Sequence, residues 1–336
     1  NWQKGKSMNR LKEIEDEISR HDSFIIASHR SPEADAIGSQ LSLSRALRQR
    51  GKRTILYNRD GVPKNLSFLK GSDSILTHDN LPSEIDNAEI GIVVDCSNLE
   101  RLGEKGKRLL ESIPIINIDH HKDNTNFGDI NYVEPVAATT QIIADLIEYM
   151  GLKLDEPIAT ALYSGVIADT SSFQNENVNA KLLHRAADLL ESGANARSVI
   201  VNLYEREPFS KLKLLGEVLS TAKFEDHIVW AEITPEKIEK AGATQEDTEG
   251  IVGKLRTTEG AKVACLFKKL PENTIKVSLR AKDGVDVSKV ASVFGGGGHK
   301  VAAGCIVDGN LEEAEKKILT EIKKNMSELP KSAKLK

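Results

Sequence analysis

The chain has 336 residues and a formal net charge of −4; 39% of its residues are hydrophobic and 29% are charged. This length suits roughly two domains, and the slightly acidic balance argues against a broad basic surface for long nucleic acid. The three cysteines are odd in number, far apart and not in a CxxC arrangement, which argues against a disulfide framework or a zinc cluster. No apolar run approaches the ~18 residues of a membrane span, and the N-terminal residues lack the apolar core of a signal peptide. We therefore expect a cytoplasmic protein without membrane contacts.

Short β-branched runs alternate with helical patterns through the first half of the chain. Strands buried on both faces have this composition, so the pattern predicts a parallel sheet covered by helices. The predicted strands are SFIIAS (23–28), KRTILYN (52–58), IGIVVD (90–95) and IPIINID (113–119). The predicted helices cover about 36–50, 138–151 and 179–193, and a mostly buried helix leads to a turn within 156–173.

A different pattern follows a charged helical stretch at 195–218, which Pro208 interrupts. Strands are predicted at 227–234, 261–270 and 274–282, the last two as a hairpin, and helices at 287–294 and about 311–324. The expected fold is therefore two-lobed α/β, with an N-terminal parallel-sheet domain at 8–194, a connector at 195–218, and a smaller α/β domain with a mixed sheet at 219–328.

Ionisable residues cluster where three of the N-terminal strands end. The clusters are His29, Glu33 and Asp35; Asp95; and Asp119, His120 and His121. Because the carboxyl ends of parallel strands share one edge, these groups should converge in one crevice. Asp169, at the end of a buried segment, could complete the set.

So many carboxylates in a low dielectric would repel one another unless cations neutralise them. Oxygen and imidazole ligands without thiolates suit Mn²⁺, or Mg²⁺ and Fe²⁺ less distinctively. The ligands are too many for one ion, and a pair of metals ~3.5 to 4 Å apart is a common hydrolytic solution. The pattern therefore indicates phosphate ester hydrolysis. A single aspartate at a strand end is more often a cap, and Asp35 would suit an N-cap, but the Asp119–His121 triplet has few structural uses.

Five stretches in order resemble the DHH phosphoesterase superfamily and, within it, the nanoRNase and pAp-phosphatase group, which joins a DHH domain to a DHH-associated C-terminal domain. They are HRSPEADAIGS (29–39), VVDCSNLERLG (93–103), NIDHHKDN (117–124), GVIADTSSF (165–173) and FGGGGHKVAAG (294–304). The resemblance covers nearly all of the chain after Ser23.

The resemblance implies two metal sites that share Asp95. The first would use His29, Glu33 and Asp95, and the second Asp35, Asp95, His120 and Asp169. His121 would face the substrate phosphate or the leaving group, and Asp119 would orient the paired histidines. The family usually has Asp at the position of Glu33, and the extra methylene puts the affinity of the first metal and full activity in question.

In the second domain, the resemblance implies that the glycine-rich segment clamps the substrate. Backbone N–H groups of Gly296, Gly297 and Gly298 would approach an anion, and His299 would reach a terminal phosphate or base. Arg280 could add a bidentate phosphate contact. Without that context, the glycines would be interpreted as a flexible turn and Arg280 as a solvated charge at a strand edge.

Our leading hypothesis is a Mn²⁺-dependent phosphoesterase that removes nucleotides from very short RNA and dephosphorylates pAp. A linear or cyclic dinucleotide phosphodiesterase uses the same chemistry and stays open. A catalytically weakened nucleotide binder is the alternative that Glu33 motivates. A nuclease for long DNA is disfavoured because extra DNA-binding domains are absent from the pattern, and the sequence leaves open whether the protein is a homodimer.

Overall fold

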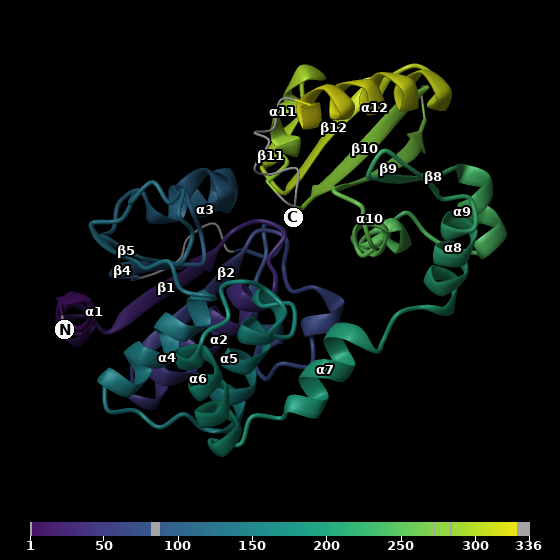
Figure 1. Ribbon diagram of the computed structural model, residues 1–336. Coiled ribbons are helices and arrows are strands. Elements are labelled where there is room, and N and C mark those ends of the chain that lie inside the picture. Colours follow the sequence, from purple (N-terminus) through teal and green to yellow (C-terminus); the bar gives the residue numbers. More distant parts are fainter. Residues whose placement is uncertain (1, 82–87, 272, 283, 328–336) are drawn as a thin grey trace. The chain divides into compact units, whose positions relative to one another are not determined.

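The computed structural model in Figure 1 describes residues 2–81, 88–271, 273–282 and 284–327. The chain divides into two compact units, Asn1–Arg206 and Glu207–Lys336. The division falls within the stretch predicted as a connector, between helix α7 (Ala196–Tyr204) and helix α8 (Phe209–Leu219), which Pro208 caps. None of the described helices is long and apolar enough to cross a bilayer.

Over the described residues, a six-stranded sheet forms the centre of the first unit. Its strand order is β3-β2-β1-β4-β5-β6 and all of its pairs are parallel, which confirms the predicted parallel sheet. The order reverses between β1 and β4, so the carboxyl ends of these two strands flank a topological switch point. The strands are β1 (Ser23–Ser28), β2 (Arg53–Asn58), β3 (Ile75–Leu76), β4 (Ile90–Val94), β5 (Ile115–Asp119) and β6 (Ile130–Val133).

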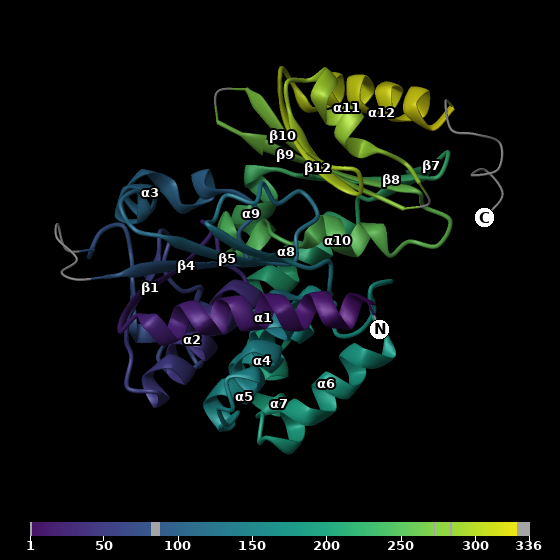
Figure 2. The ribbon, with the colours of Figure 1, turned by 90° about the vertical axis from the view of Figure 1, so that its left-hand side faces the viewer.

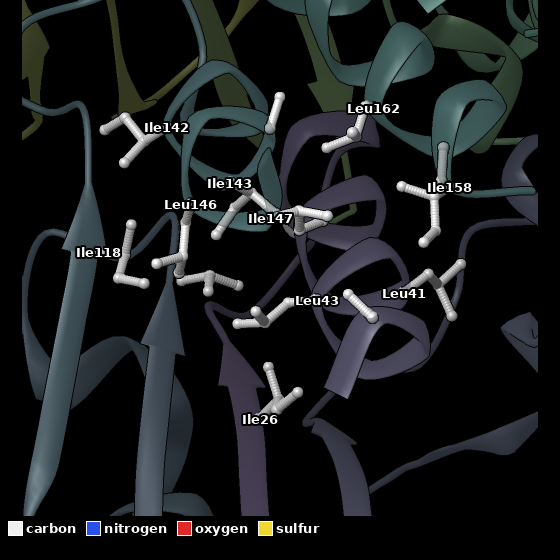
Figure 3. Close-up of a cluster of buried hydrophobic side chains, with 14 of the residues drawn as sticks. Ile26, Leu41, Leu43, Ile118, Ile142, Ile143, Leu146, Ile147, Ile158 and Leu162 are labelled. Atoms are coloured by element: carbon white, nitrogen blue, oxygen red, sulfur yellow. The ribbon is translucent and has the colours of Figure 1, made fainter. Parts of the chain in front are cut away.

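Helices cover both faces of this sheet, as its wholly buried central strands require (Figure 1). One face packs against α1 (Trp2–Arg20), α2 (Ala34–Gln49), α4 (Thr139–Tyr149) and α5 (Glu156–Asp169), and Figure 3 shows part of this core, including Ile26, Leu43 and Leu146. The other face packs against η3 (Leu99–Leu102) and α3 (Gly103–Leu110). Figure 2 shows α1 beside α4. Helix α6 (Ala180–Glu191) packs on α5, and the short helices η1 (Lys64–Leu66) and η2 (Ser72–Ser74) follow β2.

Helices α2 and α5 pack closely, and this contact matters for the site because each helix carries a predicted metal ligand. At Gly38 a Cβ atom would collide with the carbonyl oxygen of Ala161. The residue thus lets the two backbones approach more closely than any other amino acid would allow.

The second unit is a smaller α/β unit with a mixed sheet, as predicted, in the order β11-β12-β10-β9-β8-β7 over the described residues. Only β8 and β9 pair in parallel. Helices α11 and α12 cover one face, and α8, α9 and α10 pack on the other. The elements are β7 (Lys223–Glu225), β8 (Ile228–Ile233), α9 (Pro235–Ala241), η4 (Glu246–Thr248), α10 (Ile251–Arg256), β9 (Val263–Leu270), β10 (Thr274–Ala281), α11 (Val287–Val293), β11 (Gly297–His299), β12 (Ala302–Asp308) and α12 (Leu311–Ser327).

Two sequence expectations in this unit have different outcomes. The glycine run is not simply a turn, since Gly297–His299 form the edge strand β11 against β12. Strands β9 and β10 pair antiparallel as expected for the predicted hairpin, but residue 272 in its turn lies outside the described residues.

Candidate metal centre

The clustered acidic residues and histidines of the first unit come from the carboxyl ends of three adjacent strands. His29 follows β1, Asp95 follows β4 and Asp119 ends β5, and β4 pairs with both β1 and β5. Asp35 lies in the first turn of α2, and Asp169 is the last residue of α5. Helix ends thus add carboxylates to the same crevice.

His120 and Asp95 lie at the centre of this cluster. His120 Nε2 is 3.3 Å from Asp169 Oδ2, 3.6 Å from Asp95 Oδ1 and 4.0 Å from Asp35 Oδ2. On the other side, His29 Nε2 is 3.5 Å from Asp95 Oδ2. The two carboxylate oxygens of Asp95 therefore face different histidines.

Backbone carbonyls orient two of the histidines. His29 Nδ1 donates to the Arg30 carbonyl at 2.7 Å, and His120 Nδ1 donates to the Val136 carbonyl at 3.2 Å. In the neutral imidazole, donation from Nδ1 leaves the lone pair on Nε2. Both rings thus direct a ligand-type nitrogen toward Asp95, which is the arrangement that metal-binding histidines use.

His121 differs from these two histidines because its Nδ1 donates to Asp119 Oδ1 at 2.7 Å. That hydrogen bond is the largest cause that raises the pKa of His121, to about 9. The other oxygen of Asp119 accepts a bond from Asn124 at 2.6 Å. Asp119 is wholly buried and fixes the ring of its neighbour.

The cluster carries more negative charge than its surroundings neutralise. Among the described residues, the ion-pair partners of Asp35, Asp95 and Asp169 are all histidines, and no Lys or Arg is among them. Burial, followed by repulsion from neighbouring carboxylates, raises the pKa of both Asp35 and Asp169. Divalent cations would remove this repulsion, so the donor set fits metal ions.

Two groups of side chains bring ligand atoms within 4.8 Å of one another. They are Asp95, His120 and His121, and Asp35, His120 and Asp169. Oxygen and imidazole donors of this kind suit hard or borderline divalent metals. His29 and Glu33 lie outside both groups, although His29 contacts Asp95. Glu33 is exposed at the N-cap of α2, where its side chain makes no capping bond.

In the second unit, the residues predicted to bind substrate lie across three neighbouring strands. Arg280 of β10 pairs with Ala302 of β12, which in turn pairs with His299 of β11. Directly paired residues share a sheet face, so Arg280 and His299 lie in one row, about 10 Å apart at a strand spacing of ~4.8 Å. Gly297, Gly298 and His299 are all exposed, and Gly296 precedes them in the chain.

A cavity of about 320 Å³ lies beside Arg280 in this unit, and Lys268 and Lys276 also line it. Burial and the charge of Lys276 lower the pKa of Lys268, while burial and the charge of Arg256 lower the pKa of Arg280. Three cations therefore lie close together here, with the carboxylate of Glu249 beside them. The sequence did not predict a role for either lysine. The alternation of side chains along β9 and β10 indicates which residues share a face, but not whether that face lines a cavity or faces solvent.

Comparisons with known proteins match both units to known families. The chain is 33% identical over 308 residues to the bifunctional oligoribonuclease and PAP phosphatase NrnA of Thermus thermophilus, covering 90% of each protein. It belongs to the DHH family. The model described as "DHH family, N-terminal domain" matches residues 23–166, and the DHHA1 domain model matches residues 226–328. DHH family membership makes this chain a metal-dependent phosphoesterase.

The chain is also similar to two further proteins. A solved structure of an exopolyphosphatase-related protein from Bacteroides fragilis superposes with a TM-score of 0.88 at 27% identity, covering 94% of this chain and 96% of that one. The cyclic-di-AMP phosphodiesterase GdpP of Geobacillus thermodenitrificans is 24% identical over 90% of this chain but only 47% of its own length.

The DHH domain holds its acidic residues with groups that the sequence did not reveal. The backbone amides of Thr139 and Thr140, at the N-terminus of α4, donate to the two oxygens of Asp35 at 2.6 and 2.8 Å. A Cβ on Gly165 would lie 2.7 Å from Asp35 Oδ1, so only glycine leaves room for this carboxylate. Such contacts between distant segments have no local sequence signal.

Asp95 has supports of its own in this domain. Asp95 has a positive φ of 52°, a strained backbone conformation for a residue with a side chain. Its amide donates to the Ile118 carbonyl and its Oδ1 accepts from the Thr139 hydroxyl at 3.1 Å. The guanidinium of Arg101 lies 3.2 Å from His29 Nδ1. Because that nitrogen already donates to the Arg30 carbonyl, two donors meet there and form no hydrogen bond. Surrounding contacts thus fix Asp95 where it meets both histidines.

Proposed function

We propose that this protein is a Mn²⁺-dependent nanoRNase and pAp phosphatase. The single observation that carries the proposal is the cluster of His29, Asp35, Asp95, His120 and Asp169 at the switch point of a DHH-family sheet. Its side chains are largely buried, and no Lys or Arg among the described residues pairs with its three carboxylates. The similarity to a bifunctional oligoribonuclease and PAP phosphatase over 90% of both chains supports the substrate class.

Residues on either side of Asp95 would hold two metal ions. His29, Glu33 and Asp95 would bind one ion, and Asp35, Asp95, His120 and Asp169 the other. The two oxygens of Asp95 face His29 and His120 separately, which supports its role as the shared ligand. When bound, such a pair of cations activates a water for attack and neutralises phosphoryl oxygens.

His121 would act on the substrate itself. As a cation whose Nδ1 proton is held by Asp119, it has its Nε2–H free to donate to a phosphoryl or leaving-group oxygen. Asp119 would be a positioning residue, because it contacts the imidazole and holds its orientation and charge.

The DHHA1 domain would bind the rest of the substrate. The row of Arg280 and His299, with Lys268 and Lys276 beside it, offers several cations over a short distance. Exposed glycines at β11 bring bare backbone close to a bound anion. A short, highly charged molecule such as pAp or a few nucleotides fits this surface, since the net charge of −4 offers little to long nucleic acid.

A second candidate is a cyclic or linear dinucleotide phosphodiesterase. The 24% identity to a cyclic-di-AMP phosphodiesterase over 90% of this chain favours it. The chemistry at the metal ligands would be the same, so only substrate preference separates the two functions.

The test is a panel assay with Mn²⁺ and purified protein. The substrates are pAp, RNA of two to five nucleotides, cyclic di-AMP and a 24-nucleotide RNA. We expect rapid release of phosphate from pAp and of nucleotides from the short RNAs, and little cleavage of the 24-mer. Preferred cleavage of cyclic di-AMP would favour the second candidate.

A Glu33→Asp variant is assayed beside the wild type. Glu33 lies outside the two tight ligand groups, so we expect both proteins to be active and to differ chiefly in the Mn²⁺ concentration that they need. A wild type that is inactive with saturating Mn²⁺, together with an active Glu33→Asp variant, would instead indicate a binder disabled at its first metal. Inactivity of both proteins on every substrate would overturn the proposed function.

A further inference from the structure

A cavity of about 360 Å³ lies in the DHH domain next to the metal-ligand cluster. Four chain segments form it: the loop from β1 into α2, the loop that leads into η1, the end of α5 and the end of α7. We call it the Tyr204 pocket, and its main lining side chains are Pro32, Pro63, Asn65, Leu203 and Tyr204.

The Tyr204 pocket adjoins the site of the reaction. Glu33 lines it, two residues before Asp35, and so does Ala168, the residue before Asp169. The same two short segments therefore provide the wall of the pocket and two of the buried carboxylates. A molecule whose phosphate lay at those carboxylates would have its next chemical group within reach of the pocket.

The ring of Tyr204 is held in place while much of its surface stays free. Its hydroxyl donates to the carbonyl of Ile167 at 3.4 Å, two residues before Asp169, and the residue is 47% exposed. Anchoring at the polar end leaves the aromatic ring available to a ligand.

The walls of the pocket, which include the carboxylate of Glu33, favour an uncharged group over an anion. Within the described part of the chain, no Lys or Arg lines the pocket, so a phosphate would find no counter-charge. Proline, leucine and tyrosine side chains offer apolar surfaces, and the Asn65 amide can donate and accept at an edge. Nucleobases have these properties, with apolar faces and a polar rim.

We propose that the Tyr204 pocket binds the nucleobase of the nucleotide whose phosphate lies at the metal-ligand cluster, with the base against the ring of Tyr204. This inference rests on the proposed function and adds a specificity-determining residue to it. The volume is at the small end of the ~300–1,000 Å³ range for ligand sites, which suits one base. Because aromatic stacking tolerates every base, the pocket would require a base without selecting its identity.

The test compares substrates with and without a base. One pair is pAp and ribose 3,5-bisphosphate, which is the same molecule without adenine. The other is the RNA dinucleotide ApA and its two singly abasic forms. Tyr204→Ala should lower kcat/KM for pAp and ApA by roughly 5- to 150-fold, the loss expected for one base–aromatic contact. It should change cleavage of ribose 3,5-bisphosphate less than twofold. Tyr204→Phe keeps the ring and loses only the long hydrogen bond to Ile167, so it should lose much less kcat/KM for pAp and ApA than Tyr204→Ala does.

A second variant fills the Tyr204 pocket instead of removing a side chain from it. Asn65→Trp places a large side chain from an exposed position into the pocket, and it should reduce cleavage of pAp while sparing the abasic analogue. Leu183→Ala, which removes a comparably exposed apolar side chain on α6, is the control and should change neither.

Equal effects of Tyr204→Ala and Asn65→Trp on pAp and on the abasic analogue would overturn the inference, as would unchanged kcat/KM for pAp in both variants. These outcomes differ from failure of the proposed function, in which the wild type itself would cleave neither pAp nor RNA.

Discussion

At the scale of single residues, the carboxylates of Asp35, Asp95 and Asp169 lower the stability of the folded protein. Each carboxylate is largely or wholly buried, and among the described residues their only ion-pair partners are histidines. Backbone amides of α4 compensate Asp35, but Asp169 has no comparable hydrogen bonds among those described. Removing the charge of Asp169 should therefore relieve more electrostatic repulsion than removing the charge of Asp35.

We predict that Asp169→Asn stabilises the metal-free protein while it destroys the response to metal. The amide keeps the shape of the side chain but removes one charge, so the melting temperature in EDTA should rise. Wild-type protein should gain about 2.7 kcal/mol at a Mn²⁺ concentration of 100 times Kd, and the variant much less. Thermal denaturation with EDTA and with Mn²⁺ measures both effects.

The control for this comparison is Asp123→Asn, a change of the same kind at an exposed loop position. It should leave the melting temperature and the Mn²⁺ response as in the wild type. A lower melting temperature of Asp169→Asn in EDTA would mean that the carboxylate is already satisfied by the protein, contrary to our interpretation.

At the scale of secondary-structure elements, the packing of α2 on α5 sets the distance between two predicted ligands. Asp35 lies in the first turn of α2 and Asp169 is the last residue of α5. A Cβ atom at Gly38 would collide with the carbonyl oxygen of Ala161 in α5. We predict that Gly38→Ala destabilises the protein by about 1–3 kcal/mol, as overpacking does, and weakens Mn²⁺ binding at least tenfold because Asp169 moves away from Asp35.

Gly216→Ala is the matched control for this helix contact. Gly216 lies in α8 with open space around the position of a Cβ atom, so the same change should stabilise the helix by about 0.5–1 kcal/mol. Urea denaturation and calorimetric titration with Mn²⁺ compare the two variants. If Gly38→Ala bound Mn²⁺ as tightly as the control does, the spacing of α2 and α5 would not determine metal affinity.

The elements also show which parts of the fold a sequence can predict. Strands β1, β2, β4 and β5 were predicted because central parallel strands are continuous apolar runs. The strands β3, β6, β7 and β11, at the edges of the two sheets, were not predicted. They are short and partly or fully exposed, and Gly297–His299 is also rich in glycine. Pairing with a neighbouring strand holds these segments in place. The short helices α3, α9 and α10, the N-terminal α1 and the strand β12 were missed as well.

The candidate site also contains residues that the sequence reveals and residues that it does not. His29, Asp95 and Asp119 could be found because each directly follows or ends an apolar strand, and the topology then brings them together. Gly165 and Thr139 support the carboxylates only because α4 and α5 pack against α2. Partners that arise from tertiary packing leave no pattern within a short window of sequence.

At the scale of the whole molecule, the net charge of −4 makes any attraction for RNA local. Lys276 lines the cavity of the DHHA1 domain four positions before Arg280, on the same face of β10. We predict that Lys276→Ala raises KM for short RNA with little change in kcat, because the lysine would contact a phosphate remote from the reacting bond. The slope of log KM against log salt concentration should fall by about 0.7, the contribution of one phosphate contact to a single strand.

Lys323→Ala provides the comparison for this prediction, since Lys323 is a surface cation on α12 that already pairs with Glu225 and Asp226. Its removal changes the net charge of the protein by the same amount, so it should leave KM and the salt slope near those of the wild type. Steady-state assays of an RNA trimer over a range of salt concentrations separate the two cases. If both variants reduced the slope equally, overall charge would govern RNA binding, whereas a loss confined to kcat in Lys276→Ala would assign this lysine to the reaction itself.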